Sequence, residues 1–309
     1  MPEYEIIDCH VHVFPTAKRG TAFQRALGVA TPERTGTIDD LLTIKARSGI
    51  SRINMLMWTP AWFLYQELVR RLPADPKSRS KEEATLRANL SQRCLDSNEW
   101  AIDMVRQHQG ELTCFLGIDP VFMDKNTIES EIENKLSRGA KGIKMAPVHF
   151  DVNDERLIPV YEAAQRWRVP VLSYCSGRGF GQTENRDHHG HPRHFEGPLG
   201  AFPECNIILA HLGFGAEDEV ARLSNKYPNL HTDTSARLHT IGKPEGWTRD
   251  EAVFWFRRIG VDRVLFGTNY PMCNPLELEY VEVMKALPLT ETERHKIFSE
   301  NFRRLIELD

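Results

Sequence analysis

Residues 6–12 read Ile6-Ile7-Asp8-Cys9-His10-Val11-His12, an apolar run that leads directly into two histidines. In a β-strand, residues two positions apart point to the same face, so we expect the His10 and His12 imidazoles to lie together. Two imidazoles at the end of a strand can chelate one metal ion. Alternatively, both histidines are hydrogen-bonded core residues, and the remainder of the chain has to decide between these interpretations.

Apolar runs of this kind recur, and helical patterns separate them. Their near-continuous hydrophobicity is typical of parallel strands that are covered on both faces. Eight alternations of strand and helix predict a single (β/α)8 TIM barrel, whose chemistry lies at the carboxyl ends of the strands. The eight predicted strands are residues 4–11, 50–58, 112–118, 142–146, 169–174, 206–211, 230–234 and 263–268.

Long insertions follow three of these strands. They comprise residues 13–36 after strand 1, 59–97 after strand 2 and 176–199 after strand 5, and we expect them to lie over the barrel mouth as long loops on its C-terminal face. No repeat or linker interrupts the sequence, so residues 1–309 are predicted to form one domain.

Composition narrows the class of protein. A hydrophobic content of 41% and a charged content of 27% are typical of a soluble globular protein. The net charge of −4 argues against nucleic-acid binding, and no apolar run predicts a membrane span. Six scattered cysteines and the lack of a visible secretory signal indicate a cytoplasmic protein with reduced thiols. Whether the chain forms a homo-oligomer is left open.

Polar side chains stand at the predicted strand ends. Lys144 interrupts the apolar run of strand 4, and a lysine that points into a barrel needs a partner, because an unpaired buried ammonium is costly. It could bind a substrate carboxylate, carry a metal-bridging carbamate, or pair with a neighbouring acid. Strands 5, 6 and 8 end near Tyr174, His211 and Asn269, and strand 7 offers Asp233, Ser235 and Arg237.

Five of these stretches resemble the amidohydrolase superfamily, in its amidohydrolase-related branch (family 2). They are IIDCHVHVFP at 6–15, GIKMAP at 142–147, VPVLSYCSG at 169–177, IILAHLG at 207–213 and VLFGTNYP at 264–271. The resemblance covers about residues 4–300 and implies a TIM barrel with a metal site at the strand ends. The family includes hydrolases of amides and lactones, and also non-oxidative decarboxylases of small aromatic acids.

The sequence departs from the family pattern at two site positions. Tyr174 stands where strand 5 of the family has a histidine, and Asn269 stands where strand 8 has the aspartate that binds metal and shuttles a proton. A neutral amide cannot act as a base, and a phenol is a poor metal ligand. With His10, His12 and His211 as the remaining ligands, the resemblance implies one divalent ion, zinc by preference, that is weakly held or absent.

Further residues suit an anionic small-molecule substrate. Guanidinium groups bind carboxylates through two hydrogen bonds, and Trp58 could form an apolar wall. His189 and His191 belong to a histidine-rich segment that could supply a substitute ligand or base, although a solvated loop is an equally simple interpretation. The arginines near the predicted mouth are Arg178, Arg186, Arg193 and Arg237, of which Arg178 and Arg237 are the predicted substrate contacts.

Three functions remain open. The leading prediction is a hydrolase of a lactone or amide on a small carboxylate-bearing substrate. Its predicted catalytic residues are Lys144, Tyr174, Asn269 and His211, and His211 carries the proton. The second is a non-oxidative decarboxylase of a small aromatic or unsaturated acid. The third is a barrel that has lost catalysis and acts as a binding protein or subunit, because the family's proton-shuttling aspartate is replaced by Asn269.

Overall fold

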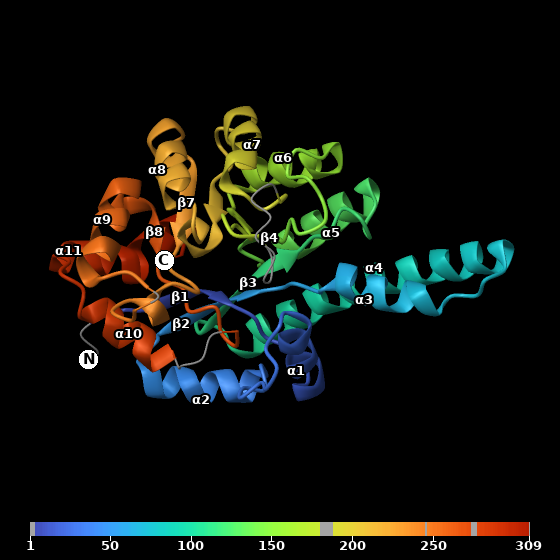
Figure 1. Ribbon diagram of the computed structural model, residues 1–309, viewed down its shortest axis with the longest axis horizontal. Helices are drawn as coiled ribbons and strands as arrows, with labels where there is room; N and C mark the ends of the chain where they lie inside the picture. Colours follow the sequence, from blue (N-terminus) through green and yellow to red (C-terminus); the bar gives the residue numbers. More distant parts are fainter. Residues whose placement is uncertain (1–3, 180–187, 245, 273–276, 309) are drawn as a thin grey trace.

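Eight parallel strands form one sheet in the order β1 to β8, and helices cover it in the computed structural model (Figure 1). The structure describes residues 4–179, 188–244, 246–272 and 277–308. The predicted TIM barrel is therefore confirmed, and each strand lies within its predicted run. The strands are β1 Ile7–Val11, β2 Arg52–Leu56, β3 Leu112–Gly117, β4 Gly142–Met145, β5 Val171–Ser173, β6 Ile207–Leu209, β7 Leu230–Asp233 and β8 Val264–Leu265.

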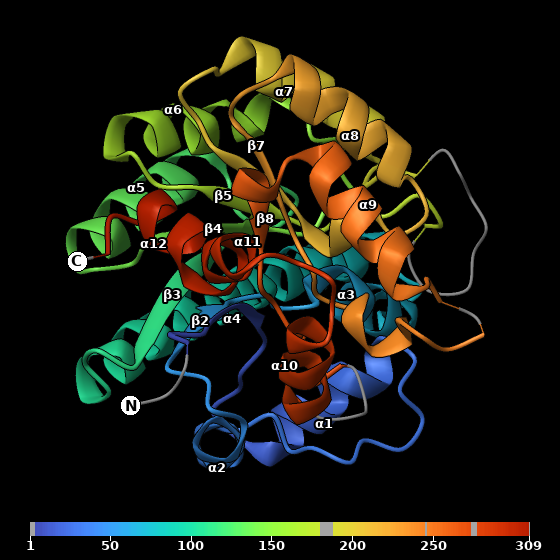
Figure 2. The ribbon, with the colours of Figure 1, turned by 90° about the vertical axis from the view of Figure 1, so that its left-hand side faces the viewer.

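Helices surround the strands, and α11 and α12 lie in front of the sheet in Figure 2. Side chains cap the starts of several helices: the Thr37 hydroxyl accepts a hydrogen bond from the Asp40 amide at the start of α2. The helices are α1 Ala17–Ala26, α2 Ile38–Ser48, α3 Ala61–Leu68, α4 Pro76–Gln107, α5 Lys125–Ser137, α6 Ile158–Trp167, α7 Glu196–Ala201, α8 Glu217–Lys226, α9 Arg249–Ile259, α10 Glu277–Lys285, α11 Glu291–His295 and α12 Asn301–Leu305.

The insertion after strand 2 differs from its prediction. Residues 59–97 were expected to form a loop, but α4 begins at Pro76, with Asp75 as its N-cap, and runs for 32 residues. Together with α3 it extends away from the barrel instead of lying over the mouth as a loop (Figure 1). Of these described helices, none is both long enough and apolar enough to span a membrane.

The ends of β8 and β1 are joined by hydrogen bonds that bring the site residues together. The Thr268 hydroxyl and backbone amide donate to the two oxygens of Asp8, at 2.5 and 3.0 Å. The amide of Asn269 donates to the carbonyl of His10, and Val11 forms a parallel bridge with Tyr270. Strand 8 thus delivers Asn269 beside the two histidines of strand 1.

Apolar side chains fill the barrel below the site, and α12 closes the amino-terminal end. Phe302 of α12 lies 5.9 Å from the Phe115 ring, centroid to centroid. This packing excludes water from the barrel floor, so polar groups within it are desolvated. The cluster contains Ile7, Cys9, Leu56, Phe115, Leu172, Ile208, Leu265, Phe302, Leu305 and Ile306, among others.

His231 is a buried titratable group in this layer, opposite Ile208 in the β6–β7 register. Burial, together with the nearby Arg263 and Arg304, lowers the pKa of His231 to about 3. An unfolded histidine has a pKa of about 6.5. Below that pH the unfolded chain binds more protons than the folded chain, so stability is complete above about pH 6.5 and is lost as the pH falls toward 3.

We therefore expect His231→Gln to reduce the acid sensitivity of the fold. Between pH 6.5 and 4.5 the free energy of unfolding of the wild type should fall by about 2 kcal/mol more than that of the variant, at about 1.4 kcal/mol per pH unit. Urea unfolding at both pH values measures this difference. His189→Gln, at an exposed histidine, is the control. If the free energy of unfolding changes equally with pH in the wild type and in His231→Gln, His231 is not the source of the acid sensitivity.

Candidate active site

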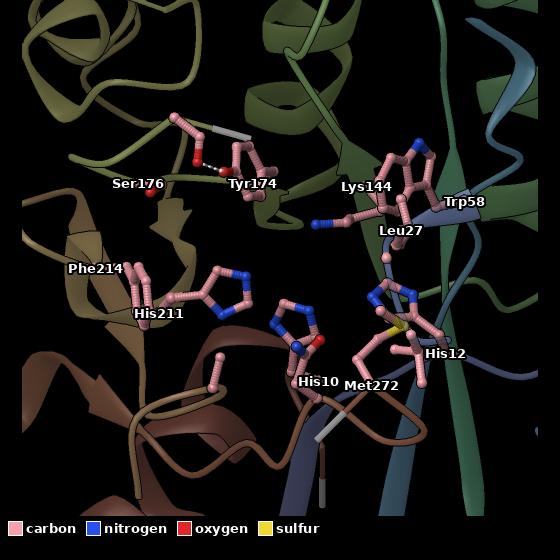
Figure 3. Close-up of a pocket in the computed structure, with 15 residues that line it drawn as sticks. His10, His12, Leu27, Trp58, Lys144, Tyr174, Ser176, His211, Phe214 and Met272 are labelled. Atoms are coloured by element: carbon pink, nitrogen blue, oxygen red, sulfur yellow. Dashed lines mark hydrogen bonds between the residues drawn. The ribbon is translucent and has the colours of Figure 1, made fainter. Parts of the chain in front are cut away.

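The carboxyl ends of the strands surround a cavity of about 340 Å³. Seven residues that the sequence analysis singled out line this cavity, and Figure 3 shows the Lys144 ammonium pointing across it toward the histidines. Parallel strands with a common direction bring their ends to one face of the barrel, which explains why residues far apart in sequence meet here. The seven are His10, His12, Trp58, Lys144, Tyr174, His211 and Asn269.

A buried hydrogen bond to a carboxylate anchors the first histidine. The Nδ1 atom of His10 lies 2.8 Å from Oδ2 of Asp233, and both side chains are almost completely buried. Burial lowers the pKa of His10, against the opposing effect of Asp233. Burial raises the pKa of Asp233, but His10 and several hydrogen bonds outweigh it and hold that pKa below its usual range. His10 therefore donates its Nδ1 proton to an ionised carboxylate.

The other two histidines are held in the same tautomer. Nδ1 of His12 lies 3.3 Å from the carbonyl oxygen of Leu56, and Nδ1 of His211 lies 3.1 Å from that of Ser235. A carbonyl oxygen can only accept, so Nδ1 carries the proton in both rings. In each of the three rings, Nε2 makes no hydrogen bond to any described residue. The three Nε2 lone pairs are therefore available to a ligand.

His211 differs from the expectation that it titrates near neutrality. It stands in the 3₁₀ segment Ala210–Gly213 directly after β6, with a positive φ of 65°. Burial, together with the nearby His10, lowers the pKa of His211 to about 3. The imidazole is thus neutral at physiological pH and offers an unprotonated Nε2 to the cavity, although its low pKa makes it a weaker base than a free imidazole.

Lys144 is the cationic residue of the cavity lining. Its side chain is buried, and its ammonium forms no ion pair or hydrogen bond with any described residue. Burial lowers its pKa to about 7, while Asp233 opposes that shift. A structural pairing with a neighbouring acid, one of the alternatives from the sequence, is therefore not formed. The ammonium remains available to a substrate anion or as a proton donor.

The two departures from the family pattern both face the cavity. The Tyr174 hydroxyl donates to the carbonyl oxygen of Gly179 at 2.7 Å, and burial raises its pKa. It is therefore a neutral phenol and not a metal ligand. Asn269 has a φ of 64°, a left-handed conformation that asparagine tolerates better than most residues. Its amide can bind a substrate oxygen but cannot take up a proton.

Four predicted substrate contacts do not line the cavity. Arg237 pairs with Glu217 at 2.9 Å and stacks on Trp247, while Arg178 lies over the outer ring face of Phe214. His191 accepts from the Arg193 amide and caps a 3₁₀ turn, and His189 is exposed. The conformation of the loops turns these side chains away from the cavity, and sequence spacing does not reveal loop conformation. Arg186 lies outside the described residues, and Arg193 is exposed.

Other residues of the site were missed as functional. The sequence analysis noted Asp233 and Ser235 at the end of strand 7 but gave them no role. Asp233 also accepts from the backbone amides of His211 and Ser235, at 3.1 and 3.0 Å. The position of Asp233 at the end of strand 7 was the sequence feature that could have indicated its role in the site. The apolar wall, which the sequence did not assign, comprises Leu27, Val29, Phe214 and Met272 beside Trp58.

The donor atoms fit a weakly held divalent ion. His10, His211 and Asp233 offer ligand-type atoms that all lie within 4.8 Å of one another. However, the Asp233 oxygens already bind His10 and two backbone amides, so this carboxylate orients ligands instead of being one. The remaining donors are neutral imidazoles and the Asn269 amide, and Lys144 adds positive charge. Nothing in this donor set selects zinc.

Comparison with known proteins agrees with the fold and the motifs. A model of the amidohydrolase family matches residues 7–308. Gamma-resorcylate decarboxylase from Rhizobium radiobacter is 26% identical over 210 residues, which span 55% of this chain and 59% of that protein. The chain thus matches less than two thirds of the length of this curated relative.

Solved structures with the same fold include several decarboxylases. The 2,6-dihydroxybenzoate decarboxylase from Rhizobium has a TM-score of 0.70 at 17% identity, with 99% of each chain covered. The 5-carboxyvanillate decarboxylase from Sphingomonas paucimobilis has a TM-score of 0.68 at 13% identity, with 99% and 100% covered. A dihydroxybenzoic acid decarboxylase from Polaromonas sp. JS666, with bound manganese and 2-nitroresorcinol, has a TM-score of 0.71 at 17% identity, with 99% and 97% covered.

We expect Asn269→Asp to raise metal retention, because it adds the anionic ligand that the donor set lacks. Elemental analysis after dialysis against a chelator should find less than one ion per wild-type chain and a clearly higher content in the variant. Asn225→Asp, an exposed position on α8, adds the same charge away from the cavity and serves as the control. A wild-type protein that keeps one ion per chain through the dialysis would refute weak binding.

Proposed function

The chain belongs to the amidohydrolase family, and we propose that it is a non-oxidative decarboxylase of a small hydroxylated aromatic acid. One observation carries the proposal: an unpartnered Lys144 ammonium and three neutral imidazoles share a cavity with an apolar wall. A planar ring fits against such a wall, and its carboxylate fits beside the ammonium. The similarity to decarboxylases supports this second prediction from the sequence over the leading hydrolase prediction.

The reaction needs a base and an acid on the chain's own side chains. Nε2 of His211 removes the proton of a ring hydroxyl, which drives electron density into the ring. Lys144 then donates a proton to the ring carbon that bears the carboxylate. The carbon–carbon bond breaks, its electron pair restores the aromatic ring, and CO₂ leaves. His211 then returns its proton to the ring oxygen. One proton is consumed for each CO₂ released, and water returns it to Lys144.

The remaining residues bind and orient the substrate. Asp233 and Ser235 keep the His10 and His211 rings in the tautomer that presents Nε2 to the cavity. Asn269 donates its amide N–H to a substrate oxygen, and Trp58 excludes water from one side of the ring. A divalent ion held by His10, His12 and His211 would, when bound, polarise a substrate oxygen.

Incubation of the purified protein with a panel of hydroxybenzoates tests the proposal. The panel contains 2,6-dihydroxybenzoate and 5-carboxyvanillate, and chromatography measures the phenol formed. We expect one or more members to lose CO₂, with and without added manganese. A parallel panel of lactones and amides carrying a carboxylate distinguishes the alternatives. Hydrolysis there without decarboxylation would restore the hydrolase prediction, and inactivity in both panels would favour a binding protein.

For any substrate that is turned over, His211→Asn and Lys144→Met should each lower kcat by about 10²–10⁴-fold, the usual contribution of general acid–base catalysis. Asparagine keeps a polar side chain but removes the base, and methionine keeps the length of lysine but removes the acid. His108→Asn, at the end of α4 that precedes β3, is the matched control. Unchanged kcat for His211→Asn together with loss of activity for His189→Asn would move the base to the strand-5 loop.

A further inference from the structure

A second, smaller cavity lies behind Trp58. Its volume is about 60 Å³, and α1, the end of β2 and α4 contribute its lining. Trp58 lines both this cavity and the catalytic one, so the indole forms part of the wall between them. Apolar side chains form most of the surface, chiefly Phe14, Phe23, Leu64 and Trp100.

Two arginines are the charged residues of this lining. Arg19 comes from α1 and Arg93 from α4, and no lining residue is acidic. Neither guanidinium makes an ion pair or hydrogen bond to any residue in the part of the chain that the structure describes. Arg93 is nevertheless partly desolvated: burial lowers its pKa, and the nearby charge of Arg19 lowers it further.

Such an arrangement is unfavourable without a counter-charge. Arginine stays protonated in proteins, so the two like charges cannot be relieved by losing a proton. Most arginines with partly buried side chains in this chain have a carboxylate partner, as Arg237 has Glu217. Arg19 and Arg93 instead face a hollow whose polar edge is formed by the Thr59 and Ser97 hydroxyls, which lie 3.3 Å apart.

We propose that this cavity is a binding site for one small oxyanion, a carboxylate or a phosphate, held between Arg19 and Arg93. The planar guanidinium group matches both anions through paired hydrogen bonds. The cavity is small, about 60 Å³ compared with about 340 Å³ for the catalytic cavity. It therefore accommodates an anionic group but not a second aromatic acid. The anion is either free in solution or carried by a molecule that extends from the catalytic side of Trp58.

Titration at low ionic strength tests the site without any need for turnover, so the result is independent of the proposed decarboxylation. The probes are inorganic phosphate, acetate and isophthalate, each against sodium chloride at matched ionic strength. Thermal shift and tryptophan fluorescence are the readouts, because Trp58 and Trp100 line the cavity. We expect at least one oxyanion to raise Tm and change the fluorescence beyond the effect of chloride.

Arg19→Gln and Arg93→Gln should each weaken this binding by about tenfold or more, the usual effect of removing a charge-assisted hydrogen bond. Arg19 lies on a different helix from Arg93, so one variant remains informative if the other folds poorly. Arg25→Gln, an exposed position on α1, is the control and should bind like the wild type. A wild type that responds only to ionic strength, or variants that bind as tightly as the control, would overturn the proposal.

A further experiment distinguishes a free anion from an anionic group that is part of a larger molecule. If the group is carried by a larger molecule, His211→Asn should weaken isophthalate binding and leave phosphate binding unchanged. If the anion is free, His211→Asn should leave phosphate and acetate binding unchanged, and isophthalate, which is too large for the cavity, should show no binding that depends on Arg19 and Arg93. Both results support the site, because each still requires Arg19 and Arg93.

Discussion

The catalytic cavity depends on the buried carboxylate of Asp233. A buried charge is tolerated only when hydrogen bonds and an opposite or polar partner replace its water shell. Asp233 obtains these from His10 on β1 and from the backbone amides that follow β6 and β7. One side chain thus ties three strand ends together and fixes the tautomer of His10. Removing it would leave two histidines without the orientation that presents Nε2 to the cavity.

The fold could be predicted because every strand repeats the same signal, an apolar run bounded by polar residues. The meeting of His10, Lys144, Tyr174, His211 and Asn269 followed from that fold, since parallel strands end on one face. The sequence could not reveal which way the loop arginines turn. It also could not reveal the acidic shift of the His211 pKa, because that shift arises from burial in three dimensions. The role of Asp233 was missed for the same reason.

The replacements at positions 174 and 269 change the chemistry available to a shared scaffold. An aspartate at 269 would supply negative charge to a metal and a site for a proton; the amide supplies neither. Lys144, which is unpartnered in the same cavity, can supply the proton in place of that aspartate. A neutral His211 can supply the base, because its Nδ1 proton is fixed by Ser235. In the proposed decarboxylation, an acid and a base are therefore still available although the family's metal ligands are incomplete.

Trp58 connects this chemistry with the arginine-lined hollow behind it. Its indole lines both the cavity that holds Lys144 and the histidines and the cavity that holds Arg19 and Arg93. Each of the two cavities thus has cationic side chains in its lining, Lys144 in one and two arginines in the other, while the Asp233 carboxylate is engaged by His10 and backbone amides. Such a charge distribution favours ligands that bring negative charge with them. It also gives the first insertion, which supplies Arg19 and the Leu27–Val29 wall, a direct part in selecting those ligands.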